Sequence, residues 1–400
     1  MAEQHGKTLV PQIRFAGFTD PWEQRKLGEV ATFGGGHTPS MSDSDNYEGG
    51  NVLWVTSQDV KSHYLDGTTT QITEKGAKEL TLYPAGSLVM VTRSGILRHT
   101  LPVAELRKPS TVNQDIRVIL PQENYYGQWL LQFFISRNKE LLLEFGKTGT
   151  TVESVDFSKM RDMVLLTPSL PEQQQIGRYF ARLDNLITLH QRKYDKLCVL
   201  KKSMLDKMFP KGGSLYPEIR FAGFTDPWEQ RKLGEVATFG GGHTPSMSDS
   251  DNYEGGNVLW VTSQDVKSHY LDGTTTQITE KGAKELTLYP AGSLVMVTRS
   301  GILRHTLPVA ELRKPSTVNQ DIRVILPQEN YYGQWLLQFF ISRNKELLLE
   351  FGKTGTTVES VDFSKMRDMV LLTPSLPEQQ QIGRYFARLD NLITLHQRKL

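Results

Sequence analysis

The tripeptide formed by Gly146, Lys147 and Thr148 is the part of this chain that looks most like a nucleotide-binding motif. The phosphate-binding pattern G-x-x-x-x-G-K-[ST] ends in these residues, and it needs a strand before it and a helix after it. Here Leu141 occupies the position of the first glycine, and the residues before Gly146 predict the end of a helix. The missing glycine and the preceding helix therefore exclude a nucleotide-binding loop. The segment instead predicts a helix C-terminus followed by an exposed, glycine-bearing turn with one cation and several hydroxyl groups.

The sequence contains no other signature of catalysis. There is no G-x-S-x-G nucleophile elbow and no H-E-x-x-H metal motif. The histidines lack ligand spacing, and Cys198 is the only cysteine, which excludes an intrachain disulfide and a multi-cysteine metal site. The glycine-rich stretch 33–40 runs into Thr-Pro-Ser where a cofactor fingerprint would begin a helix, so it predicts an irregular loop. We therefore predict a chain that is not an enzyme and has no cofactor or metal of its own.

Composition places the chain among globular proteins, with 38% hydrophobic residues, 22% charged residues and a net charge of +2. No apolar run reaches the ~18 residues that a bilayer-spanning helix requires. The polar start of the chain and the single cysteine predict a reducing, cytoplasmic setting without a membrane partner. The segment 192–211 is locally basic, which suits either phosphate contacts or a solvated helix face.

The chain is a tandem repeat of one unit. Residues 13–193 and 219–399 are identical, at an offset of 206. Each copy is long enough to be a whole domain rather than a solenoid repeat. Folding alone tolerates many substitutions, so identity over this length indicates a recent duplication, a recombination event or an engineered tandem.

Hydrophobic patterning predicts the strands and helices of each copy, which must position the polar loops between them. Apolar runs at 51–55, 86–95 and 114–121 predict strands, and 125–145 predicts a helix, which gives an α+β domain with one or two helices. After Ser169 and Pro171 a heptad pattern runs through residues 176, 180, 183, 187, 190, 194, 197, 201, 204 and 208. The predicted seam should pack against its copy at 382, 386, 389, 393, 396 and 400.

The predicted architecture is therefore two globular domains joined by long helices that form an antiparallel coiled coil. The expected boundaries are an N-terminal tail at 1–12, a first domain at 13–171, a central helix at 172–212, a second domain at 213–377 and a shorter second helix at 378–400.

Several motifs, taken in order, resemble the specificity subunits of type I restriction–modification systems. They are the start W..RKLGEV, the segment GGGHTPS...Y.GGNVLWVTSQDV, then GSLVMVTRSG, TVNQD, GTTVESVDFSKM and LPEQQQIGRYFARLDNLI before the long helix. The resemblance covers nearly the whole chain. It implies two target-recognition domains, a helical spacer and no catalytic role.

The same resemblance implies the partners. They are double-stranded DNA with a two-part target that contains adenine, two methyltransferase subunits, and the motor and nuclease subunits used in restriction. S-adenosylmethionine and ATP would bind only to those partner subunits. Family members usually carry two different recognition domains, whereas the domains here are identical, so we expect a palindromic pair of half-sites. The second helix stops at residue 400, so we expect an incomplete spacer. The alternative left open by the residues alone is a tandem adaptor that binds carbohydrate or protein.

Polar residues of the loops are the predicted DNA contacts. The alternative for each residue is that it belongs to an ordinary solvent-exposed polar loop without a role in DNA binding. In the first copy they are Thr38, Ser40, Ser57, Gln58, Arg93, Ser94, His99, Asn113, Gln114, Lys147, Thr148, Thr150 and Thr151. In the second copy they are Thr244, Ser246, Ser263, Gln264, Arg299, Ser300, His305, Asn319, Gln320, Lys353, Thr354, Thr356 and Thr357.

Among these, Arg93, Gln58, Asn113 and Gln114 are the candidates for base edges, and Lys147, Thr148 and Thr150 for phosphates or bases. An ion pair inside the domain is the alternative for Arg93. We expect Asp59 and Asp115 to orient neighbouring loops.

Overall fold

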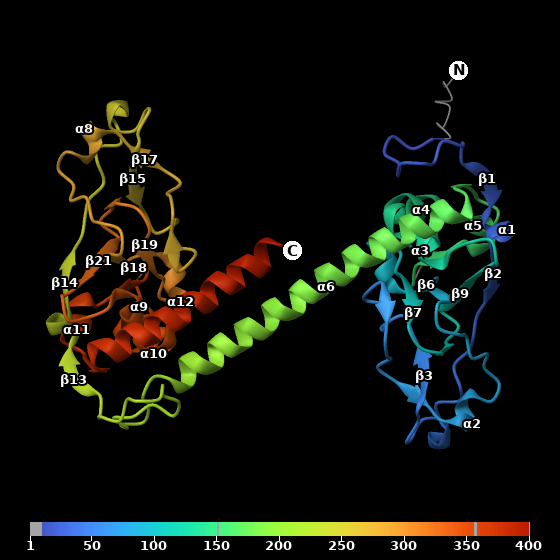
Figure 1. Ribbon diagram of the computed structural model, residues 1–400, viewed down its shortest axis with the longest axis horizontal. Helices are drawn as coiled ribbons and strands as arrows, with labels where there is room; N and C mark the ends of the chain where they lie inside the picture. Colours follow the sequence, from blue (N-terminus) through green and yellow to red (C-terminus); the bar gives the residue numbers. More distant parts are fainter. Residues whose placement is uncertain (1–9, 150–151, 356–357, 400) are drawn as a thin grey trace. The chain divides into compact units, whose positions relative to one another are not determined.

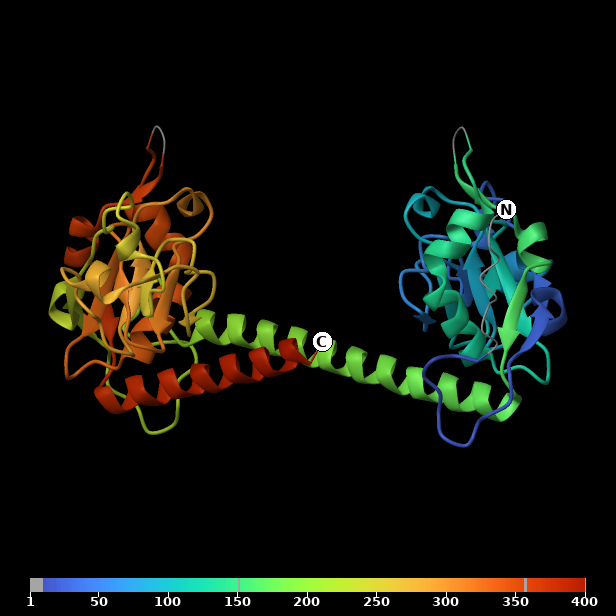
Figure 2. The same ribbon diagram turned by 90° about the horizontal axis from the view of Figure 1, so that it is seen from above.

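The computed structural model describes residues 10–149, 152–355 and 358–399, and it divides into two compact units. Unit 1 comprises residues 1–187 and unit 2 comprises residues 188–400, so the long helix α6 (Leu170–Lys207) begins in unit 1 and ends in unit 2. Figures 1 and 2 show the elements of both units from two directions.

Unit 1 contains a five-stranded sheet of order β2-β9-β6-β7-β4 and a three-stranded sheet of order β5-β3-β8. The five strands are β2 (Ala31–Gly34), β9 (Ile116–Pro121), β6 (Leu88–Val91), β7 (Val103–Leu106) and β4 (Tyr64–Leu65). The three are β5 (Gln71–Ile72), β3 (Val52–Val55) and β8 (Thr111–Val112). Two further pairs join β1 (Glu23–Lys26) to β12 (Val164–Thr167) and β10 (Gly146–Lys147) to β11 (Ser154–Val155).

The helices of unit 1 before α6 are α1 (Leu27–Val30), α2 (Glu74–Ala77), α3 (Gly127–Ser136), α4 (Asn138–Phe145) and α5 (Phe157–Arg161). The strands predicted at 51–55, 86–95 and 114–121 are confirmed as β3, β6 and β9. The helix predicted at 125–145 is instead two helices. The side chain of Asn138 accepts from the Leu101 amide and the Thr100 hydroxyl, both at 3.0 Å, and this tertiary anchor coincides with the break at Arg137.

The apolar run of β6 is continuous because both faces of the central sheet are buried. Leu88 and Met90 face the core beneath α3, whereas Val89 and Val91 face the core shared with the smaller sheet. The sheet thus forms a middle layer, with helices on one side and the β5-β3-β8 sheet on the other (Figure 1).

Unit 2 repeats these elements in the same order. They are β13 (Glu229–Lys232), α7 (Leu233–Val236), β14 (Ala237–Gly240), β15 (Val258–Val261), β16 (Tyr270–Leu271), β17 (Gln277–Ile278), α8 (Glu280–Ala283), β18 (Leu294–Val297), β19 (Val309–Leu312), β20 (Thr317–Val318), β21 (Ile322–Pro327), α9 (Gly333–Ser342), α10 (Asn344–Phe351), β22 (Gly352–Lys353), β23 (Ser360–Val361), α11 (Phe363–Asp368), β24 (Val370–Thr373) and α12 (Leu376–Arg398).

The sequence PEQQQIG fixes the start of each long helix to its domain. Glu172 is fully buried and forms a two-pronged ion pair with Arg14 at 2.6 and 2.7 Å. Gln173 accepts from the Tyr126 amide at 2.8 Å, at the first turn of α3. At Gly177 an added Cβ would lie 2.8 Å from the backbone nitrogen of Trp129, so only glycine lets α6 and α3 approach this closely.

In unit 2 the last part of α6 runs antiparallel beside α12, as both views show (Figures 1 and 2). Lys201 pairs with Asp390 at 2.5 Å, and His190 meets His396 with their Nδ1 atoms 2.8 Å apart. The two histidines occupy the same repeat position, so a local two-fold axis of the helix pair passes between them. Desolvation, and then the nearby side chains of His190, Lys193 and Lys399, lower the pKa of His396.

The predicted antiparallel pairing is therefore confirmed within unit 2, where Leu197, Met204 and Met208 join the core that contains Ile382, Phe386 and Leu389. The prediction is wrong for part of the seam in unit 1. Phe180 is 41% exposed and Ile187 is 50% exposed, because no helix among the described residues of unit 1 covers that face. Leu400 lies outside the described residues.

Candidate nucleic-acid interface

The glycine-rich loop after β2 packs against the loop after β8. At Gly36 an added Cβ would lie 1.9 Å from the carbonyl oxygen of Val112, so this glycine serves close backbone packing rather than phosphate binding. Two residues further on, the Thr38 hydroxyl donates to Gln114 Oε1 at 2.7 Å. The equivalent bond in unit 2, from Thr244 to Gln320, is 2.6 Å. Two predicted contact residues, far apart in sequence, thus form one exposed hydrogen-bonded pair in each unit.

The parallel pairing of β3 with β8 brings the turn at residues 56–59 beside Gln114. The Asn113 amide donates to the Val55 carbonyl at 3.0 Å, which aligns the two strand ends. Asp59 then accepts four hydrogen bonds, from the amide and hydroxyl of Thr56 and of Thr69, at 2.7–2.8 Å. Burial acts to raise the pKa of Asp59, but these bonds outweigh it and hold the pKa below its usual value. The expected orienting role of Asp59 is confirmed.

The turn at 56–59 leaves Gln58 exposed and Ser57 half-buried. Asn113 is different, since only 6% of its surface is exposed. Its amide group binds Asp115, with the Asp115 backbone amide donating to Asn113 Oδ1 at 3.0 Å. Asp115 and Asn113 therefore fix the loop together, as expected for Asp115. The side chains of Asn113 and its copy Asn319 are not available at the surface, so we remove both from the set of predicted base contacts.

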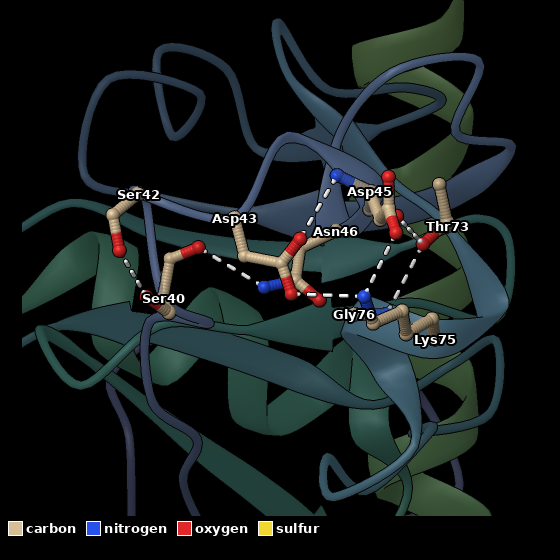
Figure 3. Close-up of polar contacts among 8 residues, drawn as sticks. All are labelled: Ser40, Ser42, Asp43, Asp45, Asn46, Thr73, Lys75 and Gly76. Atoms are coloured by element: carbon tan, nitrogen blue, oxygen red, sulfur yellow. Dashed lines mark hydrogen bonds and ion pairs between the residues drawn. The ribbon is translucent and has the colours of Figure 1, made fainter.

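The loop that carries Ser40 is held in one shape by its neighbours (Figure 3). Asn46 donates to the Ser40 carbonyl at 3.0 Å, and Thr73 donates to the Asp45 carbonyl at 2.6 Å. Lys75 pairs with both Asp43 and Asp45, at 2.9 and 3.0 Å. The side-chain bond to Lys75 is the main cause of the lowered pKa of Asp43. Ser40 therefore reaches solvent from a rigid loop, and Ser246 does so in unit 2.

Backbone bonds connect the loop after β6 to the hairpin β10-β11. The Thr92 amide donates to the Asp115 carbonyl at 2.8 Å, and the Ser94 amide donates to the Glu153 carbonyl at 3.1 Å. Arg93 forms an isolated bridge with Ser154 through the backbone, and its side chain is exposed. Among the described residues no carboxylate lies within ion-pair distance of Arg93, so the alternative of an internal ion pair is wrong for this part of the chain. His99 and its copy His305 are also exposed.

The tripeptide containing Lys147 directly follows the C-terminus of α4, as predicted. Gly146 follows α4 with φ −69° and ψ 138°, an extended conformation, and opens strand β10 instead of the glycine-bearing turn expected. Lys147 pairs with Asp156 at 2.8 Å, which is the main cause of the lowered pKa of Asp156. Lys353 and Asp362 repeat the pair at 2.9 Å.

Thr148 and Thr354 are exposed on the same hairpins. Thr150, Thr151, Thr356 and Thr357 lie outside the described residues. Beside the first hairpin lies an open groove of about 760 Å³ whose lining includes the basic side chains of Arg98, Lys139 and Lys147.

A single path of contacts therefore connects several of the predicted residues: Thr38 to Gln114, the 113–115 loop to Thr92, Arg93 to Ser154, and Ser154 to Lys147 across the hairpin. Hydroxyl, amide, guanidinium and ammonium groups of this kind bind base edges and phosphates. The described residues contain no group of three or more His, Cys, Asp or Glu side chains placed to hold a metal. No helix within them is long and apolar enough to cross a membrane.

The sequence matches the family model described as "Type I restriction modification DNA specificity domain" twice, over residues 19–198 and 225–400. The chain belongs to this family. The match supports DNA specificity and not the adaptor alternative.

Relatives of these specificity domains include the Escherichia coli type I restriction enzyme EcoR124I/EcoR124II specificity subunit, which is 31% identical over 186 residues. That match covers 43% of this chain and 46% of the relative, so it spans about half of each protein. The Methanocaldococcus jannaschii type I restriction enzyme MjaIX specificity subunit is 23% identical over 95% of this chain and 89% of its own length. Among solved structures, the type I restriction–modification S subunit from M. genitalium has the same fold, with a TM-score of 0.64 at 10% identity over 98% of this chain and 94% of that one.

Two interactions of each specificity domain were not predicted from the sequence. Arg98 pairs with Glu153 at 2.6 Å and so holds the end of the hairpin β10-β11 against the loop after β6. Arg117 lies over the ring of Phe157 at 5.3 Å, with its guanidinium next to Gly35. The polar break at residue 117 in the apolar run of β9 is the only sequence signal for the second interaction, and nothing local signals the first.

Proposed function

We propose that the chain is the DNA sequence-recognition subunit of a type I restriction–modification complex, and that each unit reads one half of a bipartite target. The observation that carries this proposal is the double family match, which covers both units. The path of polar loops in each unit supports it. Rigid loops present their side chains without the ordering entropy that mobile loops lose on binding.

Base readout is assigned to the exposed polar groups along that path. The Thr38 hydroxyl donates to Gln114 Oε1 and so orients the amide, which directs the two Nε2 donors toward an acceptor such as an adenine or guanine N7. Arg93 is the second candidate for base edges. Gln58, which lies off the path in the turn at residues 56–59 and is exposed, is the third. Lys147 places a positive charge at the hairpin, although its ion pair with Asp156 offsets part of that charge. Phosphate contacts of this type position the protein on DNA without reading sequence.

The target is proposed to be palindromic: a half-site, a fixed gap and the reverse complement of that half-site. Two domains of identical sequence read the same bases. The local two-fold axis at His190 and His396 favours reading them on opposite strands.

The partners are proposed to be two methyltransferase subunits and the restriction subunits, in the cytoplasm, where the DNA lies. The chain itself supplies recognition and no chemical step. S-adenosylmethionine and ATP are assigned to the partner subunits.

The test is to purify the chain with its methyltransferase subunit, methylate genomic DNA and sequence the modified positions. The expected motif has two halves that are reverse complements. Two unrelated halves would refute the palindromic target, and the absence of any methylated motif, with the complex intact, would refute the function.

A further inference from the structure

Arg117 is the one charged side chain in the apolar run of β9, and it lies at the end of the sheet next to the polar path. The residues on either side of it enter the core shared with the smaller sheet, so the Arg117 side chain points to the opposite face. Arg117 pairs in register with Met90 of β6, three residues before Arg93. It therefore lies beside the place where the 113–115 loop and the loop of Arg93 leave the sheet.

The guanidinium of Arg117 lies between the two parts of the candidate interface. Its Cζ atom is 5.3 Å from the ring centre of Phe157, which follows Asp156 and begins α5. Its Nη1 atom lies 3.3 Å from the position that a Cβ would take at Gly35, in the glycine-rich loop that leads to Thr38. Arg117 therefore has the loop after β2 on one side and the base of the hairpin β10-β11 on the other.

The hydrogen-bonding capacity of this guanidinium is not used by the described part of its own domain. No carboxylate there lies within ion-pair distance of Arg117, and none of its three nitrogens has a hydrogen-bond partner there. Nε is buried, so the edge formed by Nη1 and Nη2 is the one open to a ligand. An unpaired and partly buried charged donor is unfavourable for the domain by itself, and an external acceptor would offset part of that cost.

Unit 2 has the same arrangement at Arg323. The Cζ atom of Arg323 is 5.3 Å from the ring centre of Phe363, and its Nε is buried without a partner. Nη1 lies 3.3 Å from the Cβ position at Gly241, and it makes one long contact, of 3.5 Å, with the Gly240 carbonyl. The aromatic ring and the buried Nε restrict the side chain, so each arginine presents its open edge in one direction.

We propose that Arg117 and Arg323 each read one guanine, at the same position of the two half-sites. Nη1 and Nη2 donate together to O6 and N7 of the base in the major groove, the commonest specific contact between a basic side chain and DNA. A phosphate contact requires only positive charge, which an exposed lysine such as Lys147 provides without a fixed direction. A planar pair of donors held in one orientation instead matches a base edge. This assignment rests on the proposed function, because it requires that each unit read half of the target.

The experiment uses the chain together with its methyltransferase subunit and maps the methylated sites in genomic DNA. The wild type is expected to require a G·C pair at one fixed position of both half-sites. Arg117→Met keeps a side chain of similar length against the ring of Phe157 but removes the donors. This variant should therefore also methylate sites that lack the G·C pair in one half-site. The double variant Arg117→Met with Arg323→Met should methylate sites that lack it in both.

The quantity measured is methylation of the altered sites relative to methylation of the wild-type target, and it should rise at least about fivefold in each variant. The matched control is Arg25→Met with Arg231→Met, because these exposed arginines already pair with Glu23 and Glu229. The control should leave the motif unchanged. Co-purification of each variant with the methyltransferase subunit checks that it is folded.

Three results would overturn the proposal. The first is a wild-type target without a G·C pair in its half-sites. The second is an unchanged motif in both variants of Arg117. The third is methylation that falls equally at every site, which would assign the two arginines to phosphates or to the packing of the glycine-rich loop. Absence of any motif for the intact wild-type complex is a different result, and it would refute the proposed function itself.

Discussion

Truncation of the same phenylalanine in the two copies should have unequal effects on stability. Replacing a fully buried phenylalanine by alanine costs ~3–5 kcal/mol, the sum of lost transfer energy and the cavity that remains. Phe386 is 0% exposed and should show the full effect. Phe180 is 41% exposed, so roughly three-fifths of that value, ~2–3 kcal/mol, is expected at most, and less where the open site relaxes.

Residues 194–207 provide the assay, because they occur once in the chain and form the part of α6 that packs in unit 2. Phe386→Ala should accelerate amide hydrogen exchange in this segment at least about tenfold, the equivalent of ~1.4 kcal/mol of lost packing. Phe180→Ala should leave the segment unchanged. Because the substitutions are chemically identical, intrinsic propensity cancels from the comparison. Equal acceleration by both variants, or none by Phe386→Ala, would refute the assignment of α12 as the buried copy.

Three further outcomes are expected. Lys147→Ala combined with Lys353→Ala should weaken DNA binding for all sequences and reduce the dependence of the affinity on salt concentration. Gel shifts at several salt concentrations would measure both effects. An unchanged salt dependence would show that the two lysines only pair with their aspartates and do not contact DNA. The histidine pair should loosen in acid. The pKa of His396 is lowered in the folded state, so the contribution of its neutral side chain to the free energy of unfolding is complete above the ordinary histidine pKa. This contribution is lost through the lowered pKa of the folded state, as the pH falls below the ordinary value of ~6.5. Exchange of residues 194–207, corrected for intrinsic rates, should therefore rise from pH 7.5 to 5.5 (roughly one pH unit on either side of that pKa), and His396→Gln should abolish the rise. Gly36→Ala should disrupt the loop after β2 and reduce methylation of the target without affecting binding between the chain and its methyltransferase, which co-purification would check.

Patterning predicted the sheet of each domain because it is a local property. The apolar runs at β3, β6 and β9 have the length and composition of buried strands, and the heptad register identified the long helix. The break between α3 and α4 was missed because it depends on Asn138 binding a loop 37 residues away in sequence. The helix propensities of residues 125–145 do not reveal that hydrogen bond.

The candidate interface was predicted as a composition of loops rather than as a geometry. Thr38 and Gln114 were both nominated, but their hydrogen bond depends on Gly36 packing against Val112, which no spacing rule reveals. Asn113 was misjudged for a related reason. An asparagine in a short polar loop is predicted to be exposed. Here the backbone bond from Asn113 to Val55, at the end of β3, holds it in the interior.

The unequal burial of Phe180 and Phe386 also has an evolutionary consequence. At present the same helix sequence is used in both environments. The buried environment in unit 2 is the one that requires phenylalanine at this position. Once the copies accumulate mutations independently, purifying selection acts unevenly on them. Position 180, which is 41% exposed, should tolerate polar replacements that position 386 rejects. The first substitutions to distinguish the two copies should therefore gather on the open helix face of the first.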